Sequence, residues 1–443
     1  MTFHKKTGWL RYLWYAFLFA SLSTVIIVAL VKHAHKNKHQ GVGWSKSNRP
    51  KDSGFCDSAL WTHDPDGVPP IDAFRHVSQA SFEFPVSAHL VFTAEGEPAL
   101  AHGTIEIDDS GEAGADTVNV DITAYSNNLR DLLDETKACQ LTPTKNPVHG
   151  VGIYTNKHRP NFAYSYQRMV TWHIKVRLPA PSGRSPINIT GLSTHMPMFV
   201  HHIGDIARSV HFTALSSNSF AVPISVQSLA AERVTVETMD GTITGTFNAS
   251  RSLSLFTTNA PLKVDVGMLS SRDDGLFSTD LSIQTMNGNV TVSMHDNVYA
   301  NCVLCKGPSL RTSACMPRQL PARGGVFEVG LKTSNSSLTI AMLDAPPDHI
   351  LRMNAQTWGA SANVVLPKTY EGEYHLRSPP MDSPAIHVAD LEDPAGRGRR
   401  RVVEKHNVKG VIGGTIQWLP SIRNTHSGVV NIWASKLGMS LSL

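Results

Sequence analysis

Apolar residues alternate with polar ones in several short runs, and these runs share one spacing. Around Thr285, apolar residues stand four and two positions before the centre and five, seven and nine after it, namely Leu281, Ile283, Val290, Val292 and Met294. The same offsets recur around further centres, so that the set is Thr238, Thr257, Thr285, Thr333 and Thr357. Gly245 is the one position of this pattern that is not apolar. Period-two alternation is typical of strands with one buried face, so the pattern predicts a repeat of paired strands.

Each repeat must contain a turn at its centre. The last apolar position before the centre and the first after it are an odd number of residues apart, and an unbroken strand would send them to opposite faces. Asp240-Gly241 and Asn287-Gly288 stand at this point. These residue types tolerate the positive φ that we expect the corner to need. Weaker copies centre on Ser217 and Ala434, and repeats of roughly 20–30 residues are typical of stacked β-solenoid rungs or a long meander.

The rest of the chain fits the same class. Residues 79–215 also alternate in short runs between turn-rich boundaries, and the one helical candidate outside the N-terminus is the segment 128–138. We therefore predict an all-β fold, an irregular β-solenoid or stacked β-meander that follows one N-terminal transmembrane α-helix. Its parts would be an N-terminal β region at 79–215 and a β-repeat region at 216–443, with loop-like inserts near 296–325 and 376–409.

The first part of the chain predicts a membrane anchor. After an N-terminal tail at 1–12, residues 13–31 run without a charge. At 1.5 Å per residue this helix would span roughly 30 Å, the thickness of the hydrocarbon core. A cleaved signal peptide is the alternative, but its apolar region is shorter and ends in small residues. A basic cluster follows Val31 instead, and residues 32–78, rich in Lys, Gly, Ser and Pro, are predicted to form a stalk.

Two signals disagree about the orientation of this anchor. Lysines after the span favour a cytoplasmic position for the bulk of the chain. Four Asn-x-Ser/Thr sequons favour an extracytoplasmic domain in the secretory pathway or at the cell surface, with glycosylation candidates Asn188, Asn248, Asn289 and Asn335. We predict the extracytoplasmic orientation and leave the cytoplasmic one open. A net charge of only +4 does not favour nucleic acid as a partner.

Three groups of residues are weak candidates for a metal site. Three of the five cysteines, Cys302, Cys305 and Cys315, lie together, with His295 nearby. A zinc ribbon needs a second close ligand pair, which is missing, so one disulfide in an exposed loop or unpaired thiols is the preferred interpretation. His201, His202 and Asp205 lie within "HMPMFVHHIGDIARSVH", which has no spacing that would bring its histidines together. The acidic stretch "DDSGEAGAD" resembles a calcium loop only in composition. We expect no metal and no cofactor.

Enzymatic motifs are missing from the sequence. It contains no G-x-S-x-G elbow, no phosphate-binding glycine loop and no paired carboxylates spaced for glycoside hydrolysis. We therefore expect a protein without catalytic residues.

A second group of basic residues is predicted to form a basic loop, Arg397, Arg399, Arg400 and Arg401. It has three interpretations: a solvated loop, a contact for anionic lipid headgroups or phosphate, and a processing site for a kexin-type protease. The last would require a lumenal domain.

The chain resembles a group of uncharacterised fungal single-pass membrane proteins with an adhesin-like β-solenoid domain. The resemblance covers roughly residues 80–443 and rests on "VTVETMDGTITGTFNASRSLSLFTTNAPLKVDVGM", "LSIQTMNGNVTVSM", "FEFPVSAHLVF" and "SGVVNIWASKLGMSLSL". It implies a fold but no catalytic residue. We expect a non-catalytic binding module for a protein or glycan ligand, which can also form oligomers. The alternatives are a self-assembling scaffold at a membrane and a membrane-tethered hydrolase.

Overall fold

The structure is a computed structural model. It describes residues 56–58, 61–64, 67, 69, 74–141, 148–155, 170–271, 278–299, 324–379, 384–408, 411–421, 428–435 and 438–443. Cys56–Leu443 forms one compact unit. The predicted tail at 1–12, the predicted transmembrane helix at 13–31 and most of the predicted stalk lie outside the described residues. Within the described ranges, no helix has both the length and the apolar character needed to cross a bilayer.

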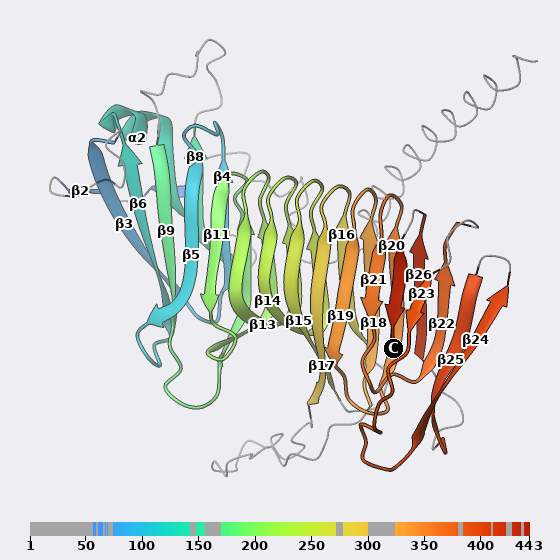
Figure 1. The fold of residues 1–443 in the computed structure, drawn as a ribbon. Coiled ribbons are helices and arrows are strands. Elements are labelled where there is room, and N and C mark those ends of the chain that lie inside the picture. Colours follow the sequence, from blue (N-terminus) through green and yellow to red (C-terminus); the bar gives the residue numbers. More distant parts are fainter. Residues whose placement is uncertain are drawn as a thin grey trace, which may run out of the picture. The chain divides into compact units, whose positions relative to one another are not determined.

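Two layers of parallel strands form the body of the molecule (Figure 1). The first layer holds, in spatial order, β8 (Val148–Thr155), β4 (His89–Glu95), β10 (Ile187–His195), β12 (Val210–Asn218), the second halves of β13 (Ile224–Glu237) and β14 (Ile243–Phe256), β16 (Thr279–Thr285), β18 (Val326–Thr333), β20 (Ile350–Thr357), β26 (Gly428–Ala434) and β22 (Gly372–Arg377). The second layer holds β9 (Val170–Pro179), β5 (His102–Gly111), β11 (Phe199–Asp205), the first halves of β13 and β14, β15 (Leu262–Ser271), β17 (Val290–Tyr299), β19 (Leu338–Asp344), β21 (Ala362–Val365), β27 (Met439–Ser442) and β23 (Ala385–His387).

The predicted repeat is the rung of this solenoid. One rung is a strand of the first layer, a corner, and a strand of the second layer. Every apolar position of the five predicted repeats is buried between the layers, and each centre pairs with the equivalent residue of the next rung, as Thr285 does with Thr333 and Thr333 with Thr357. The all-β solenoid is therefore confirmed. Stacking of successive rungs buries the apolar side chains that a single rung would leave exposed to solvent.

The corners are held by a buried hydroxyl and an exposed amide ladder. The Oγ1 atoms of Thr238 and Thr285 each accept a hydrogen bond of 3.1 Å from the backbone N–H three residues later. On the outside, each amide Nδ2 donates to the side-chain oxygen one rung away, at 2.6 Å from Asn259 to Asp240 and 2.7 Å in the next two steps, a ladder of Asp240, Asn259, Asn287 and Asn335. The repeated threonines and asparagines therefore specify the corner.

Two expectations about the corners were wrong. The centre of the first weak copy is Ser219 rather than Ser217, because Asn218 pairs with Glu237 and the Ser219 hydroxyl donates to Thr238 Oγ1 at 3.0 Å. The corner glycines do not adopt a positive φ. Gly288 is required for another reason: a Cβ there would overlap the backbone carbonyl of Ala260 in the preceding rung.

We expect Gly288→Ala to lower the free energy of unfolding by about 1–3 kcal/mol or more, because the overlapping atom is backbone and cannot rotate away. Gly183→Ala is the matched control, since a Cβ at Gly183 meets no atom within 4 Å. Urea unfolding followed by circular dichroism measures both. Equal stability of the two variants would contradict the steric role of Gly288.

Antiparallel strands continue both layers at one end of the stack and the first layer at the other, where β23 is the outer strand of the second layer. At one end β6 (Thr117–Ser126) pairs with β9, β3 (His76–Pro85) with β6, and β2 (Thr62–Asp64) with β3, while β7 (Thr136–Leu141) pairs with β8 and β1 (Cys56–Ser58) with β7. At the other end β25 (Val411–Leu419) pairs with β22, and β24 (Arg400–Val408) pairs with β25. We call β24 and β25 the C-terminal cap. The short helix α2 (Leu129–Glu135) lies within the predicted helical segment.

Chain order and spatial order differ at both ends. The rung of β26 and β27 lies between the rung of β20 and β21 and the rung of β22 and β23, although it follows both in the sequence. The rung of β4 and β5 is likewise enclosed by later rungs. Parallel rungs therefore continue through the region 79–215 without a break at 215. The predicted insert near 376–409 contains β23 and β24.

Candidate functional site

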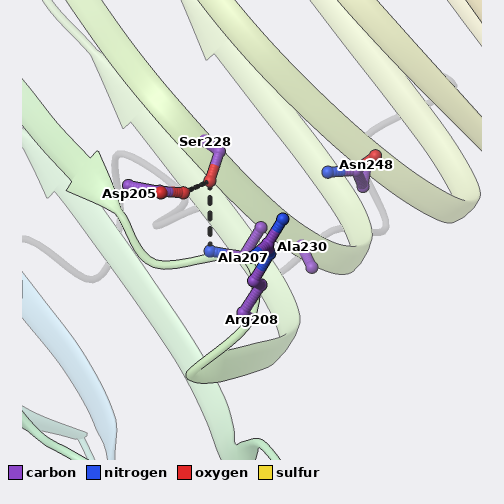
Figure 2. A pocket seen from close by; sticks show the side chains of 6 residues that line it. All are labelled: Asp205, Ala207, Arg208, Ser228, Ala230 and Asn248. Carbon is purple, nitrogen blue, oxygen red and sulfur yellow. Dashed lines mark hydrogen bonds between the residues drawn. The ribbon is translucent and has the colours of Figure 1, made fainter.

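An open hollow of about 350 Å³ lies on the outside of the solenoid where β11, β13 and β14 approach one another (Figure 2). Its lining consists of Asp205, Ala207, Arg208, Ser228, Ala230 and Asn248. Ser228 Oγ donates to Asp205 Oδ1, and the Ala207 N–H donates to the same hydroxyl at 3.4 Å. Asn248 Nδ2 donates to the Leu229 carbonyl at 3.2 Å.

This hollow has the chemistry of a binding surface. The hydrogen bond from Ser228 Oγ to Asp205 Oδ1 orients the hydroxyl at the surface of the hollow. Arg208 is exposed at the rim and can pair with a carboxylate or phosphate. The hollow therefore offers contacts for a polar ligand.

The structure separates the histidine candidates. Alternation along β11 turns His201 into the interior and His202 to the outside. His201 Nε2 lies 2.9 Å from Thr194 Oγ1, and burial lowers the pKa of His201 to about 4. His202 Nδ1 lies 3.1 Å from Ser225 Oγ on the outer surface. These residues and Asp205 do not converge on one point, and within the described ranges no three potential ligands cluster.

The cysteine candidates Cys302, Cys305 and Cys315 lie outside the described residues. A cysteine outside this cluster forms a disulfide: Cys139 of β7 is disulfide-bonded. Its strand pairs with β1, which begins at Cys56, and Ser58 lies opposite Cys139. The sequence drew attention to the clustered cysteines, since isolated ones show no spacing that reveals a bond.

The four sequon asparagines differ in their surroundings. Asn188 and Asn289 are exposed, and Asn289 accepts hydrogen bonds through Oδ1, from the N–H and Oγ of Ser337. Glycans attach at Nδ2, and this atom is engaged in Asn335 by the corner ladder and in Asn248 by the Leu229 carbonyl. Asn188 and Asn289 are therefore the sites at which a glycan would disturb the fold least.

The predicted basic loop leads into the C-terminal cap, and two of its residues, Arg400 and Arg401, belong to β24. The solvated-loop interpretation was wrong for Arg399, whose side chain is 4% exposed. Its guanidinium lies 3.0 Å from Asp393 and 2.8 Å from Glu371, and it stacks on Trp418 at 5.7 Å. Asp393 also accepts backbone N–H groups from Arg397 and Arg399, and the bonds to Arg399 hold the pKa of Asp393 well below its usual range. Arg399 and Asp393 are structural residues.

The other three arginines occupy different environments. Arg397 pairs with Asp348 at 3.4 Å. Arg400 is exposed at the start of β24. Arg401 stacks on Trp418 at 5.9 Å, and in the part of the chain that the structure describes its guanidinium nitrogens have no hydrogen-bond partner. Burial lowers the pKa of Arg401. The four side chains do not form one basic surface for lipid or phosphate.

We expect the folded domain to resist a kexin-type protease after Arg401. The backbone of β24 is paired with β25 from Arg400 onward, and proteases cleave exposed, flexible segments. A synthetic peptide of residues 395–407 is the control substrate and should be cut completely under the same conditions, as followed by mass spectrometry. Cleavage of the folded chain at the rate of the peptide would contradict this assignment.

Exposed apolar residues follow several of the corners and were not predicted from the sequence, with Thr258 and Ser334 at the same position in the rungs between them. The first residue after a centre is exposed and large in four rungs, at Phe220, Met239, Met286 and Trp358. The signal was present in the repeat, at the position between the buried threonine and the amide ladder. Trp358 also meets Trp433 of β26, with ring centroids 4.1 Å apart.

No family model matches the chain, and no curated protein does. Solved structures with an all-β fold do match. One is a candidate cell adhesion protein from Clostridium sporogenes, 8% identical, covering 82% of this chain and 99% of that one, with a TM-score of 0.15. A candidate adhesin from Bacteroides fragilis is 14% identical, with 65% and 100% coverage and a TM-score of 0.23. Another from Parabacteroides merdae is 7% identical, with 65% and 89% coverage and a TM-score of 0.27.

Proposed function

We propose that the chain is a non-catalytic, adhesin-like binding protein that is anchored in a membrane through residues 13–31. Its β-solenoid would present the outer faces of the stacked rungs to a ligand. The observation that carries this proposal is the way the stack ends: antiparallel strands extend both layers at one end and the first layer at the other, and the outer strand β23 of the second layer is only three residues long. End-to-end assembly needs bare strand edges. The outer strand β24 carries Arg400, Glu404 and Lys405, and such charges oppose edge pairing. The lateral faces remain as the extended surface.

We further propose that the domain lies outside the cytoplasm. The disulfide at Cys139 supports this placement, because structural disulfides persist in oxidising compartments. The exposed sequons at Asn188 and Asn289 support it as well. As a fungal single-pass protein of the resembled group, the chain would be a glycoprotein of the secretory pathway or cell surface.

Protease protection of microsomes that contain the tagged full-length chain tests the placement. We expect the C-terminal bulk to be protected and to shift in mobility after endoglycosidase treatment. Digestion of the bulk without a shift would overturn the extracytoplasmic orientation and redirect the search to cytosolic ligands.

The scaffold alternative predicts association that grows with concentration. Light scattering of the purified chain across a hundredfold concentration range distinguishes the scaffold from the binding protein. We expect a binding protein that does not assemble end to end to keep one molecular mass at every concentration. Filaments at high concentration would show that the caps do not prevent assembly.

A further inference from the structure

Trp358 and Trp433 form an exposed aromatic pair at one corner of the solenoid. Trp358 follows the corner centre Thr357 and is 51% exposed. Trp433 lies on the outer side of β26 in register with Gln356 of β20. The two rings are inclined at 73°, and the Ser435 hydroxyl donates to the Trp358 carbonyl, which fixes the corner. Trp358 is therefore held in place by its neighbours while about half of the residue stays exposed to solvent.

Amide side chains lie beside the rings on the same outer face. Asn354 pairs in register with Asn431, and Gln356 Nε2 donates to Asn354 Oδ1 at 3.0 Å. Arg377 of β22 pairs in register with Trp433 on its other side, and neighbouring strands lie about 4.8 Å apart. Figure 1 shows β20, β26 and β22 close together at the red end of the stack. We call this set the aromatic–amide patch: Asn354, Gln356, Trp358, Asn431, Trp433 and Arg377.

The patch combines the two kinds of group that recognise a sugar ring. The C–H face of a pyranose is apolar and packs against an aromatic face, whereas its hydroxyls both donate and accept hydrogen bonds. Asn and Gln amides also do both. A specific protein interface buries about 800 Å² per partner around an apolar centre. Here the two rings are bordered by amides and by Arg377, with His375 in register with Asn431 and Lys332 in register with Gln356, so polar surroundings favour a glycan over a protein.

We propose that the aromatic–amide patch is a glycan-binding site, with a pyranose ring stacked on Trp358 and its hydroxyls bonded to Asn354 and Asn431. This inference rests on the proposed binding function and names its ligand class and site. It also distinguishes one rung from the others. Phe220 occupies the same corner position and is 47% exposed, but within the described residues it has no ring partner comparable to Trp433.

The test compares the full chain with Trp358→Ala and with the matched control Phe220→Ala. Each is applied to an array of chito-, manno-, gluco- and galacturono-oligosaccharides, and the oligosaccharide that binds the unmodified chain is titrated by tryptophan fluorescence. We expect Trp358→Ala to weaken binding about tenfold or more, as loss of a central aromatic anchor does, and Phe220→Ala to leave it within about twofold. Asn431→Ala is a second variant that keeps both rings, and it should weaken binding as well. Thermal unfolding confirms that each variant folds.

The possible results distinguish failure of the proposed glycan site from failure of the proposed binding function. Glycan binding that survives both Trp358→Ala and Asn431→Ala overturns the site and leaves a binding function elsewhere on the solenoid. A protein partner that is cross-linked at Trp358, with no oligosaccharide bound, overturns the glycan class alone. Absence of binding to the array and to extracellular protein overturns both.

Discussion

Asp393→Ala is expected to loosen the C-terminal cap by about 3–5 kcal/mol, because it removes the more deeply buried of the two carboxylates that pair with the guanidinium of Arg399 and leaves Glu371 alone. It also removes the acceptor for three backbone N–H groups, those of Ala395, Arg397 and Arg399. Amides of β24 and β25 should then exchange with solvent about a hundredfold to several thousandfold faster, as hydrogen–deuterium exchange would measure. Asp390→Asn is the control, since Asp390 is exposed on the same segment.

A double variant distinguishes the loss of the ion pair from the loss of side-chain packing. Replacing both residues, as in Asp393→Ala with Arg399→Met, also removes the buried charge that has lost one of its two carboxylate partners, and should recover part of the protection. The cap should also loosen in acid. The pKa of Asp393 is lowered in the folded state, so its stabilisation is present above about pH 4 and is lost as the pH falls below that value. Unchanged exchange in Asp393→Ala would show that the cap is held by strand pairing alone.

Asp296→Asn is expected to stabilise the solenoid at pH 8.5 by about 3–5 kcal/mol and to have little effect at pH 4. Asp296 of β17 is 1% exposed, and neither carboxyl oxygen has a hydrogen-bond partner in the part of the chain that the structure describes. Burial, and next the charge of Asp344, raise the pKa of Asp296 to about 8. The unfolded chain ionises this group near pH 4, so folding loses stability as the pH rises from about 4 to 8.

Urea unfolding across this pH range measures the effect. Asp265→Asn on the neighbouring β15 is the matched control, because Asp265 lies on the exposed face and carries the same chemical change. The unmodified chain and Asp265→Asn should lose stability in parallel from pH 4 to 8, whereas Asp296→Asn should lose less. A constant difference between Asp296→Asn and the unmodified chain at every pH would contradict a protonation effect.

The stacked repeat could be predicted because its information is local and regular. Leu281, Ile283, Val290 and Val292 alternate within one rung, and the same pattern in the next rung requires the same fold. The corner at Thr285 could be predicted from the odd spacing alone. The steric need for glycine at position 288 could not be predicted, because the backbone carbonyl that a Cβ would overlap belongs to Ala260 of another rung. Contacts between rungs depend on register, which only the assembled stack defines.

The surface features were beyond sequence reasoning for a related reason. Arg399 and Asp393 are six residues apart in a polar segment that reads as a loop, and only its folding over Trp418 buries them. Trp358 and Trp433 are far apart in the sequence and become neighbours because β26 is placed beside β20. A buried acid such as Asp296 looks, in the sequence, like any other strand-edge aspartate.

The order in which the rungs are made follows from the position of β26 and β27. The ribosome completes β20 to β25 before either strand of this rung exists, so β20 and β22 have no common neighbour to pair with during that interval. Bare edges of parallel strands are prone to pair with other chains. In newly made molecules the edges of β20 and β22 that later pair with β26 are therefore unpaired for a time. The length of this interval depends on the rate of translation and on how fast β26 and β27 insert between their neighbours. Aggregation during expression should accordingly be greatest for variants that slow this insertion, even where the finished protein is stable.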